Sequence, residues 1–123
     1  MLFRSVNDYW AFLRSHRPTV RHRERNVTLG LRLRPRDNGA FSIEWYEMGR
    51  MGRSKQPIAK RNVPKGRGPA YSIRALLRGQ PEWIGAHVTD AEAVFAAMRE
   101  HQATLLKILV AAAAYASLVA GTD

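Results

Sequence analysis

The sequence predicts a single α+β domain over residues 1–123. Its expected elements are an N-terminal helix, a small antiparallel sheet of three or four strands built on a hairpin, a short helix and a long C-terminal helix. Residues 27–34 and 41–46 alternate between apolar and polar side chains, which is typical of half-buried strands. Apolar residues at helical spacing occur before and after these runs. With 123 residues and no cysteine, the chain can bury one core but has no disulfides.

The N-terminal helix is expected over about residues 6–15. Ser5-Val6-Asn7-Asp8 has the spacing of a capping box, with Asp in place of the usual Glu or Gln. The buried stripe of this helix follows helical spacing and consists of Val6, Tyr9, Trp10 and Leu13. We expect Pro18 to end the helix and the basic segment 17–25 to form a loop.

The first two strands are expected to form a hairpin around Asp37-Asn38-Gly39. A two-residue Asn-Gly turn would place the apolar residues of the two strands on opposite faces. A three-residue loop, with Gly39 in the left-handed conformation, instead pairs Leu33 with Ile43 on one face. The sequence therefore predicts the three-residue loop.

This register also sets the outer face of the hairpin. Arg32 falls opposite Glu44, which predicts a cross-strand ion pair. Arg34 falls opposite Ser42 and is expected to keep a free guanidinium.

The segment 55–73 has two interpretations. Residues 58–63 are expected to form a third strand, which begins after Pro57 or lies at an edge. Residues 70–73 form either a fourth strand or the start of a short helix that Ser72 caps and Gly79 ends. The two interpretations overlap, and the sequence does not decide between them.

The C-terminal helix is expected to begin at the capping box 89–92 and to run about 30 residues, because no Pro or Gly occurs before Gly121. Its uncharged end, residues 108–120, is too short to span a bilayer, so we expect no membrane insertion. An end that is apolar on all sides needs cover, either by packing back on the sheet or by a homodimer contact through residues 105–120. The apolar residues at helical spacing along this helix are Val94, Phe95, Met98, Leu105, Ile108, Leu109, Ala112, Tyr115 and Val119.

The charge of the chain is segregated. The net charge is +10 and the pI about 11.1, which predicts a polyanionic partner, nucleic acid before a membrane surface. Residues 1–80 hold 18 of the 20 Lys and Arg and five acids, a net charge of +13, whereas residues 81–123 carry a net charge of −3. We therefore expect residues 1–80 to face nucleic acid and residues 81–123 to pack or self-associate.

The candidate nucleic-acid-binding residues lie on the hairpin and in the stretch 49–68, which has seven Lys or Arg and no acid. Most are Arg, whose planar guanidinium binds phosphate or guanine through two hydrogen bonds. The set is Arg32, Arg34, Arg36, Arg50, Arg53, Lys55, Lys60, Arg61, Lys65 and Arg67.

Three known phosphate-binding motifs do not fit the stretch 49–68. Residues 49–52 match the GxxG loop of KH domains, but they follow a strand where that loop joins two helices. Residues 52–55 resemble the start of a double-stranded-RNA-binding helix, which Pro57 and Pro64 would break. A P-loop is excluded because no Gly-Lys-Ser/Thr occurs.

The sequence offers no group of residues arranged for catalysis. His16 and His22 lie among arginines, which disfavours a metal cation. Glu44 and Glu47 are three apart on a strand and so lie on opposite faces. We expect no catalytic residue, no metal and no cofactor, and therefore no enzyme. The N-terminus lacks a secretory hydrophobic region, which predicts the cytoplasm.

A further set of residues resembles the MobI-type conjugative mobilisation proteins of plasmids and integrative elements. Along about residues 29–109 the shared features, in order, are Ile43-Glu44-Trp45-Tyr46, the basic Gly-rich loop, Tyr71-Ser72, Pro81-Glu82-Trp83, and a helix with Glu92, Phe95 and Arg99. The first 26 residues and the alanine-rich end lie outside the resemblance. It implies an accessory factor that binds the origin of transfer and helps a separate relaxase, and it supplies no catalytic residues.

The expected function is therefore non-enzymatic binding of duplex DNA, within conjugative mobilisation. Two other functions stay open. One is RNA or ribosome binding. The other is a small protein-interaction module whose acidic partner meets the basic face.

Overall fold

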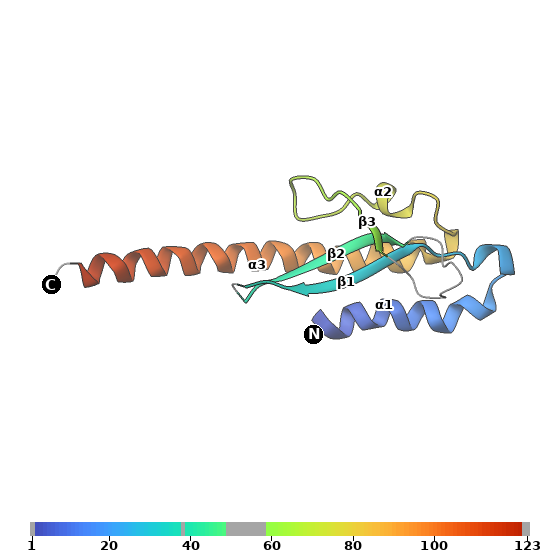
Figure 1. Ribbon diagram of the computed structural model, residues 1–123, viewed down its shortest axis with the longest axis horizontal. Coiled ribbons are helices and arrows are strands. Elements are labelled where there is room, and N and C mark those ends of the chain that lie inside the picture. Colours follow the sequence, from blue (N-terminus) through green and yellow to red (C-terminus); the bar gives the residue numbers. More distant parts are fainter. Residues whose placement is uncertain (1, 38, 49–58, 122–123) are drawn as a thin grey trace.

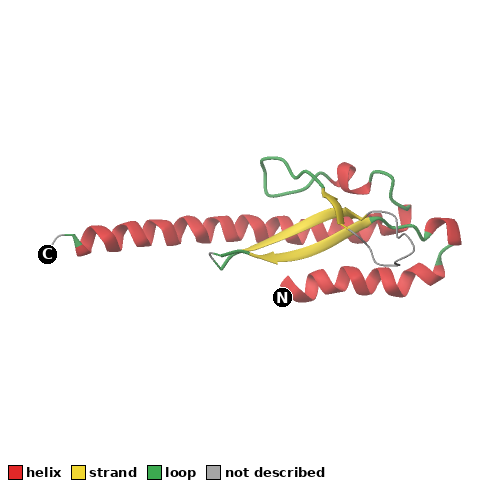
Figure 2. Ribbon diagram, viewed as in Figure 1, coloured by secondary structure: helices red, strands yellow, loops and turns green. Residues whose placement is uncertain are grey.

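The computed structural model describes residues 2–37, 39–48 and 59–121, and of residues 2–5, 59 and 60 it describes only the backbone. It confirms the α+β class and the expected order of elements (Figures 1 and 2). The helices and strands are α1 (Leu2–His16), β1 (Leu29–Pro35), β2 (Phe41–Met48), β3 (Ala59–Asn62), α2 (Ile73–Leu77) and α3 (Gly85–Ala120). Short 3₁₀ turns lie at Arg17–Thr19, His22–Glu24 and Glu82–Ile84.

The sheet has three antiparallel strands in the order β1-β2-β3. The predicted hairpin register is confirmed: Leu33 pairs with Ile43, and Arg32 pairs with Glu44. Gly39 has a φ of +83°, the left-handed conformation that the three-residue loop requires. The apolar residues of both strands therefore share one face, and that face meets α1 and α3.

The segment 70–73 is not a fourth strand. The hydroxyl of Ser72 accepts a hydrogen bond from the backbone N–H of Ala75 at 3.3 Å, so Ser72 caps α2. Gly79 follows the helix with a φ of +74°. The interpretation as a short capped helix is confirmed.

Both predicted helix starts are wrong by a few residues. The helix α1 begins at Leu2 and α3 begins at Gly85, so both capping boxes lie inside their helices. The turn Glu82–Ile84 leads directly into α3, and the hydroxyl of Thr89 donates to the carbonyl of Gly85 at 2.7 Å instead of capping. The expected loop 17–25 contains two 3₁₀ turns.

The core lies between the inner face of the sheet, α1 and the first half of α3. Its largest fully buried side chains include Tyr9, Trp45 and Phe95. The Tyr9 hydroxyl donates to the carbonyl of Leu29 at 2.7 Å, and the Trp10 indole donates to the carbonyl of Leu31 at 2.9 Å. The outer edge of β1 is thereby covered by α1, which satisfies carbonyls that would otherwise be open to another strand.

One carboxylate is buried in this core. Glu92 on α3 has 2% of its surface exposed, and both of its oxygens accept hydrogen bonds. One accepts from the Trp45 indole at 2.9 Å, and the other accepts from the backbone N–H of Tyr71 at 2.8 Å. Arg99, seven residues further along the same helix face, pairs with Glu92 through hydrogen bonds of 2.7 and 3.0 Å.

Arg99 fastens two further segments to α3. Its guanidinium donates to the carbonyl of Pro69 at 2.9 Å and to the carbonyl of Ile43 at 3.1 Å, and it lies 4.8 Å from the ring centroid of Tyr71. We call Glu92 and Arg99 together the Glu92–Arg99 hub. The hub joins β2, the segment 69–71 and α3.

The second half of α3 leaves the body of the molecule (Figure 1). Residues 103–120 are all exposed, so the expectation that this end packs back on the sheet is wrong. The reason is length: a helix of 36 residues spans about 54 Å, whereas a strand of eight spans about 26 Å. By length and composition alone, the stretch Glu82–Ala120 is long and apolar enough to cross a membrane.

Replacing one member of the hub tests its structural role. We expect Glu92→Gln to lower the free energy of unfolding by about 3–5 kcal/mol, because Arg99 keeps its charge but loses the buried partner. Urea unfolding followed by circular dichroism measures this change. Glu100→Gln is the matched control on the exposed surface of α3 and should change stability by less than about 0.5 kcal/mol. Equal stabilities of the two variants would contradict the role of the hub.

Candidate nucleic-acid interface

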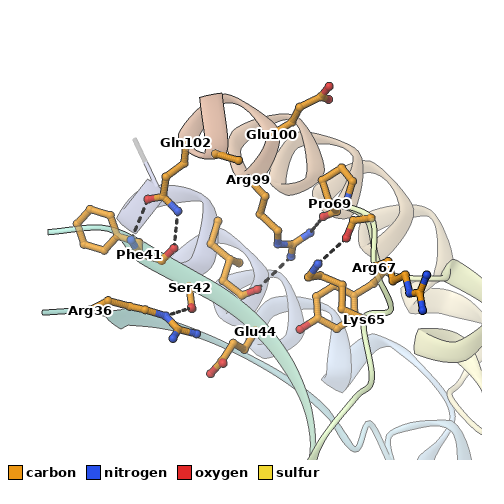
Figure 3. A pocket seen from close by; sticks show the side chains of 14 residues that line it. Arg36, Phe41, Ser42, Glu44, Lys65, Arg67, Pro69, Arg99, Glu100 and Gln102 are labelled. Carbon is orange, nitrogen blue, oxygen red and sulfur yellow. Dashed lines mark hydrogen bonds between the residues drawn. The ribbon is translucent and has the colours of Figure 1, made fainter. Parts of the chain in front are cut away.

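A cleft of about 480 Å³ opens where the hairpin, the loop 65–69 and α3 meet (Figure 3). The start of β2, with Phe41 and Ser42, forms one side of it. The loop 65–69 forms the opposite side, and Arg99 and Gln102 of α3 lie between the two. Three elements far apart in the sequence therefore build one concave surface.

Three of the predicted cations line this cleft: Arg36, Lys65 and Arg67. The Arg36 guanidinium donates to the hydroxyl of Ser42 at 2.6 Å, which holds it against the hairpin. The Lys65 ammonium donates to the carbonyl of Gly68 and so stays within its own loop. Arg36 and Arg67 are exposed, and they lie on opposite sides of the cleft, on the hairpin and on the loop 65–69 (Figure 3).

Two acids also line the cleft, but they do not cancel its positive charge. Glu44 already accepts from Arg32 at 2.9 Å. Glu100 lies at the rim, and its carboxylate points away from the basic side chains (Figure 3). The cleft therefore presents an excess of positive charge and of hydrogen-bond donors. The chemistry it offers is the binding of an anion such as phosphate.

The cleft is preformed, because α3 fastens both of its sides. The backbone N–H of Phe41 donates to the Gln102 side chain at 2.8 Å, and the Gln102 amide donates back to the carbonyl of Phe41 at 2.7 Å. On the other side, Arg99 donates to the carbonyl of Pro69. A ligand that enters the cleft would therefore lose little affinity to the ordering of its walls.

Two predicted cations on the outer face of the hairpin are occupied within the protein. Arg32 donates to Glu44 at 2.9 Å and to Asn62 at 2.6 Å, and it lies 5.3 Å from the ring centroid of Tyr46. The predicted Arg32–Glu44 pair is thus confirmed. The expected free guanidinium of Arg34 is wrong, because Arg34 lies 3.8 Å from the same carboxylate. Arg34 lies opposite Ser42, two residues along β2 from Glu44, and so reaches this carboxylate diagonally across the two strands.

On β3, Arg61 is also engaged. It forms two hydrogen bonds to Glu47, of 2.9 and 3.0 Å, and these raise the pKa of its guanidinium. Lys60 belongs to the same strand, but its side chain lies outside the described residues. Arg50, Arg53 and Lys55 also lie outside the described residues. Nucleic-acid binding stays a prediction for all ten cations, and for these four the position of the side chain also lies outside the description.

Sequence reasoning missed two features of the surface. Gln102, which ties the hairpin to α3, stands three residues after Arg99, and this helical spacing places both on one face. The second feature is a basic corner at the end of α1, far from the hairpin turn (Figure 1), with exposed Arg14, Arg21 and Arg23. The charge of this segment was visible in the sequence, but its separation from the cleft depends on the fold.

Metal binding finds no support in the described part of the chain. No group of three or more His, Cys, Asp or Glu side chains there is placed to hold an ion. The cleft instead gathers guanidinium and ammonium groups, which repel a metal cation.

Comparison with known proteins identifies a family. A family model described as MobI protein matches residues 4–113. A search of curated proteins and a search of solved structures each found no match. The matched region is longer than the expected 29–109 and takes in α1, so the expectation that the first 26 residues fall outside the resemblance is wrong. The match includes every element that builds the cleft.

The two hairpin arginines should differ in their effect on stability. We expect Arg32→Gln to lower the free energy of unfolding by about 1 kcal/mol, because Glu44 and Asn62 both lose a donor. Arg34→Gln, the matched control, should change it by less than about 0.5 kcal/mol, because its contact is long and exposed. Thermal unfolding of both variants measures the difference. A larger loss for Arg34→Gln would contradict this assignment.

Proposed function

The chain belongs to the MobI family of conjugative mobilisation proteins, and on this premise we propose that it is a non-enzymatic factor that binds duplex DNA at the origin of transfer. In this proposal it works in the cytoplasm beside a separate relaxase, which performs the strand cleavage. The observation that carries the proposal is the preformed basic cleft formed by Arg36, Lys65 and Arg67.

The geometry of the cleft suits a nucleic-acid backbone. Arginine binds phosphate through two parallel hydrogen bonds, and Arg36 and Arg67 line the cleft on its two sides, one on the hairpin and one on the loop 65–69. Most protein–DNA hydrogen bonds go to phosphate and sugar and fix the position of the protein on the duplex. We therefore assign the cleft to backbone positioning.

The ten predicted cations divide into two roles in this proposal. Arg32 and Arg61 hold the sheet together through Glu44 and Glu47 and contribute little to DNA binding. Arg34 supplements the cleft from the outer face of the hairpin. The remaining phosphate contacts are assigned to the basic stretch that contains Arg50, Arg53, Lys55 and Lys60.

Partners other than DNA follow from the same proposal. The relaxase, or another DNA-processing protein, is the expected protein partner. A second copy of the chain is the proposed partner of residues 105–120, because these residues are exposed and nearly uncharged. Self-association through residues 105–120 and DNA binding at Arg36, Lys65 and Arg67 thus involve different stretches of the chain.

Salt-dependent binding tests the cleft. We expect an origin-of-transfer duplex from the element that encodes this chain to bind with a log–log salt slope of about −5 or steeper, if six or more phosphates are neutralised. The triple variant Arg36→Gln, Lys65→Gln, Arg67→Gln should flatten this slope by roughly 3 and weaken binding about 100-fold at 100 mM salt. Electrophoretic shift or fluorescence anisotropy between 50 and 200 mM salt measures both quantities.

The basic corner provides a control of equal charge. The variant Arg14→Gln, Arg21→Gln, Arg23→Gln removes the same three charges and should weaken binding roughly threefold or less, through long-range attraction alone. Equal losses in the two triple variants would show that net charge, and not the cleft, drives binding. No binding at 50 mM salt would contradict the proposal. Tighter binding to duplex RNA in competition would replace it with the RNA-binding alternative.

A further inference from the structure

A second groove lies on the other side of the contact between the hairpin and α3, and it is apolar. It has a volume of about 920 Å³ and is lined by Phe41, Val94, Ala97, Met98, His101 and Leu105, among others. Phe41 is 40% exposed and Val94 is 48% exposed, although both stand on the folded body of the protein. Contiguous exposed apolar surface of this kind marks an interaction site.

The groove is the beginning of a longer stripe on α3. The residues of the stripe are separated alternately by four and three positions, which is the heptad spacing of a coiled coil. The stripe, which we call the seam, consists of Val94, Met98, His101, Leu105, Ile108, Ala112 and Tyr115, and the spacing continues to Val119. Glu100 and Lys107 occupy a different heptad position and face away from the seam.

We propose that the seam binds the same helix of a second copy, in antiparallel orientation, with the tip of each helix lying in the apolar groove of the other copy. This inference rests on the self-association proposed above and adds its geometry. At the centre of the pair, Leu105 of each copy faces Ile108 of the other. Met98 then faces Tyr115 of the second copy, and His101 faces Ala112 of the second copy.

Side-chain volume favours the antiparallel orientation. A parallel pair would place Ala112 against Ala112 and Tyr115 against Tyr115, which leaves one layer underfilled and crowds the next. The antiparallel pair combines a small or medium side chain with a larger one in these layers. Its contact also includes the groove, which is continuous with the seam.

Charge favours the same orientation. Residues 1–80 carry a net charge of +13, and a parallel pair would place two such regions at the same end of the coiled coil. The antiparallel pair separates them by about the length of the projecting helices. In the antiparallel pair the two helix dipoles also point in opposite directions, which is the favourable arrangement.

The seam extends over 26 residues, from Val94 to Val119, and offers eight side chains from each copy to the contact. Stable interfaces bury about 1,200–2,000 Å² in total, so the contact must include the groove beside the hairpin as well as the projecting helix. A lipid bilayer suits the same surface less well. The helix is long and apolar enough to cross a membrane by length and composition, but a spanning segment of about 20 residues ending at Ala120 would include the charge of Lys107 and the polar His101 and Gln102.

Disulfide trapping tests the geometry, since the native chain has no cysteine. We expect the double variant Met98→Cys, Tyr115→Cys to form covalent dimers under mild oxidation. The single variants Met98→Cys and Tyr115→Cys should each remain uncrosslinked alone and form the covalent dimer when mixed. The two positions are 17 residues apart on one helix, about 25 Å, so a disulfide within one chain is excluded.

The control is the double variant Glu100→Cys, Ala113→Cys. Residue 100 of one copy and residue 113 of the other lie at the same height along the proposed pair, but both point away from the seam. This variant should therefore give less than a tenth of the covalent dimer that Met98→Cys, Tyr115→Cys gives. Non-reducing electrophoresis measures the dimer fraction, and circular dichroism verifies that each variant keeps the wild-type helix content.

Each other outcome overturns the inference. Covalent dimers from either single variant alone would show a parallel pair, which removes the proposed geometry but keeps self-association. A monomeric mass in light scattering at all concentrations would remove both, and DNA binding by the same sample would be unaffected. Co-flotation of the monomer with phosphatidylethanolamine–phosphatidylglycerol vesicles would assign the surface to lipid.

Discussion

The buried ion pair between Glu92 and Arg99 is the contact on which the rest of the structure depends. A carboxylate with 2% exposure is stable only where its charge and its lone pairs are satisfied, and here four hydrogen bonds satisfy them. The donors come from β2, from the segment at Tyr71 and from α3. Because the two hub residues stand seven apart on one helix face, α3 acts as a rigid scaffold to which the hairpin and the loop 65–69 are attached.

This arrangement separates two surfaces of opposite character on one helix. Near the hub, α3 supports the preformed basic cleft. Beyond the sheet, the same helix becomes almost uncharged and fully exposed. In the proposed dimer, these surfaces have distinct roles: the cleft positions the DNA backbone, and the seam joins two copies. The antiparallel orientation then places the two clefts at opposite ends of the assembly, which suits a factor that contacts two separated stretches of duplex.

The sequence was sufficient to predict the hairpin in detail and insufficient to predict the hub. Alternation with a period of two, together with Gly39, allowed only one register, and the structure has that register. From the sequence, Glu92 and Arg99 stood out only as features shared with the MobI family. Their burial was not predicted, because a charged pair on a helix is ordinarily exposed to solvent. Their burial depends on Trp45 and Tyr71, which the fold brings together from distant segments. The contact between Arg34 and Glu44 likewise depends on side-chain conformation, which the spacing of the residues in the sequence does not determine.

The central claim, that the cleft held by the hub is the DNA-binding surface, can be tested on the unmodified protein. Hydrogen–deuterium exchange of the wild-type chain, with and without a saturating origin-of-transfer duplex, reports which backbone amides the DNA protects. The account predicts slower exchange at residues 36–42 and 65–68, which surround the cleft, and unchanged exchange in the basic corner at residues 21–25. Protection confined to residues 21–25, or none at the cleft while the duplex is bound, would contradict it.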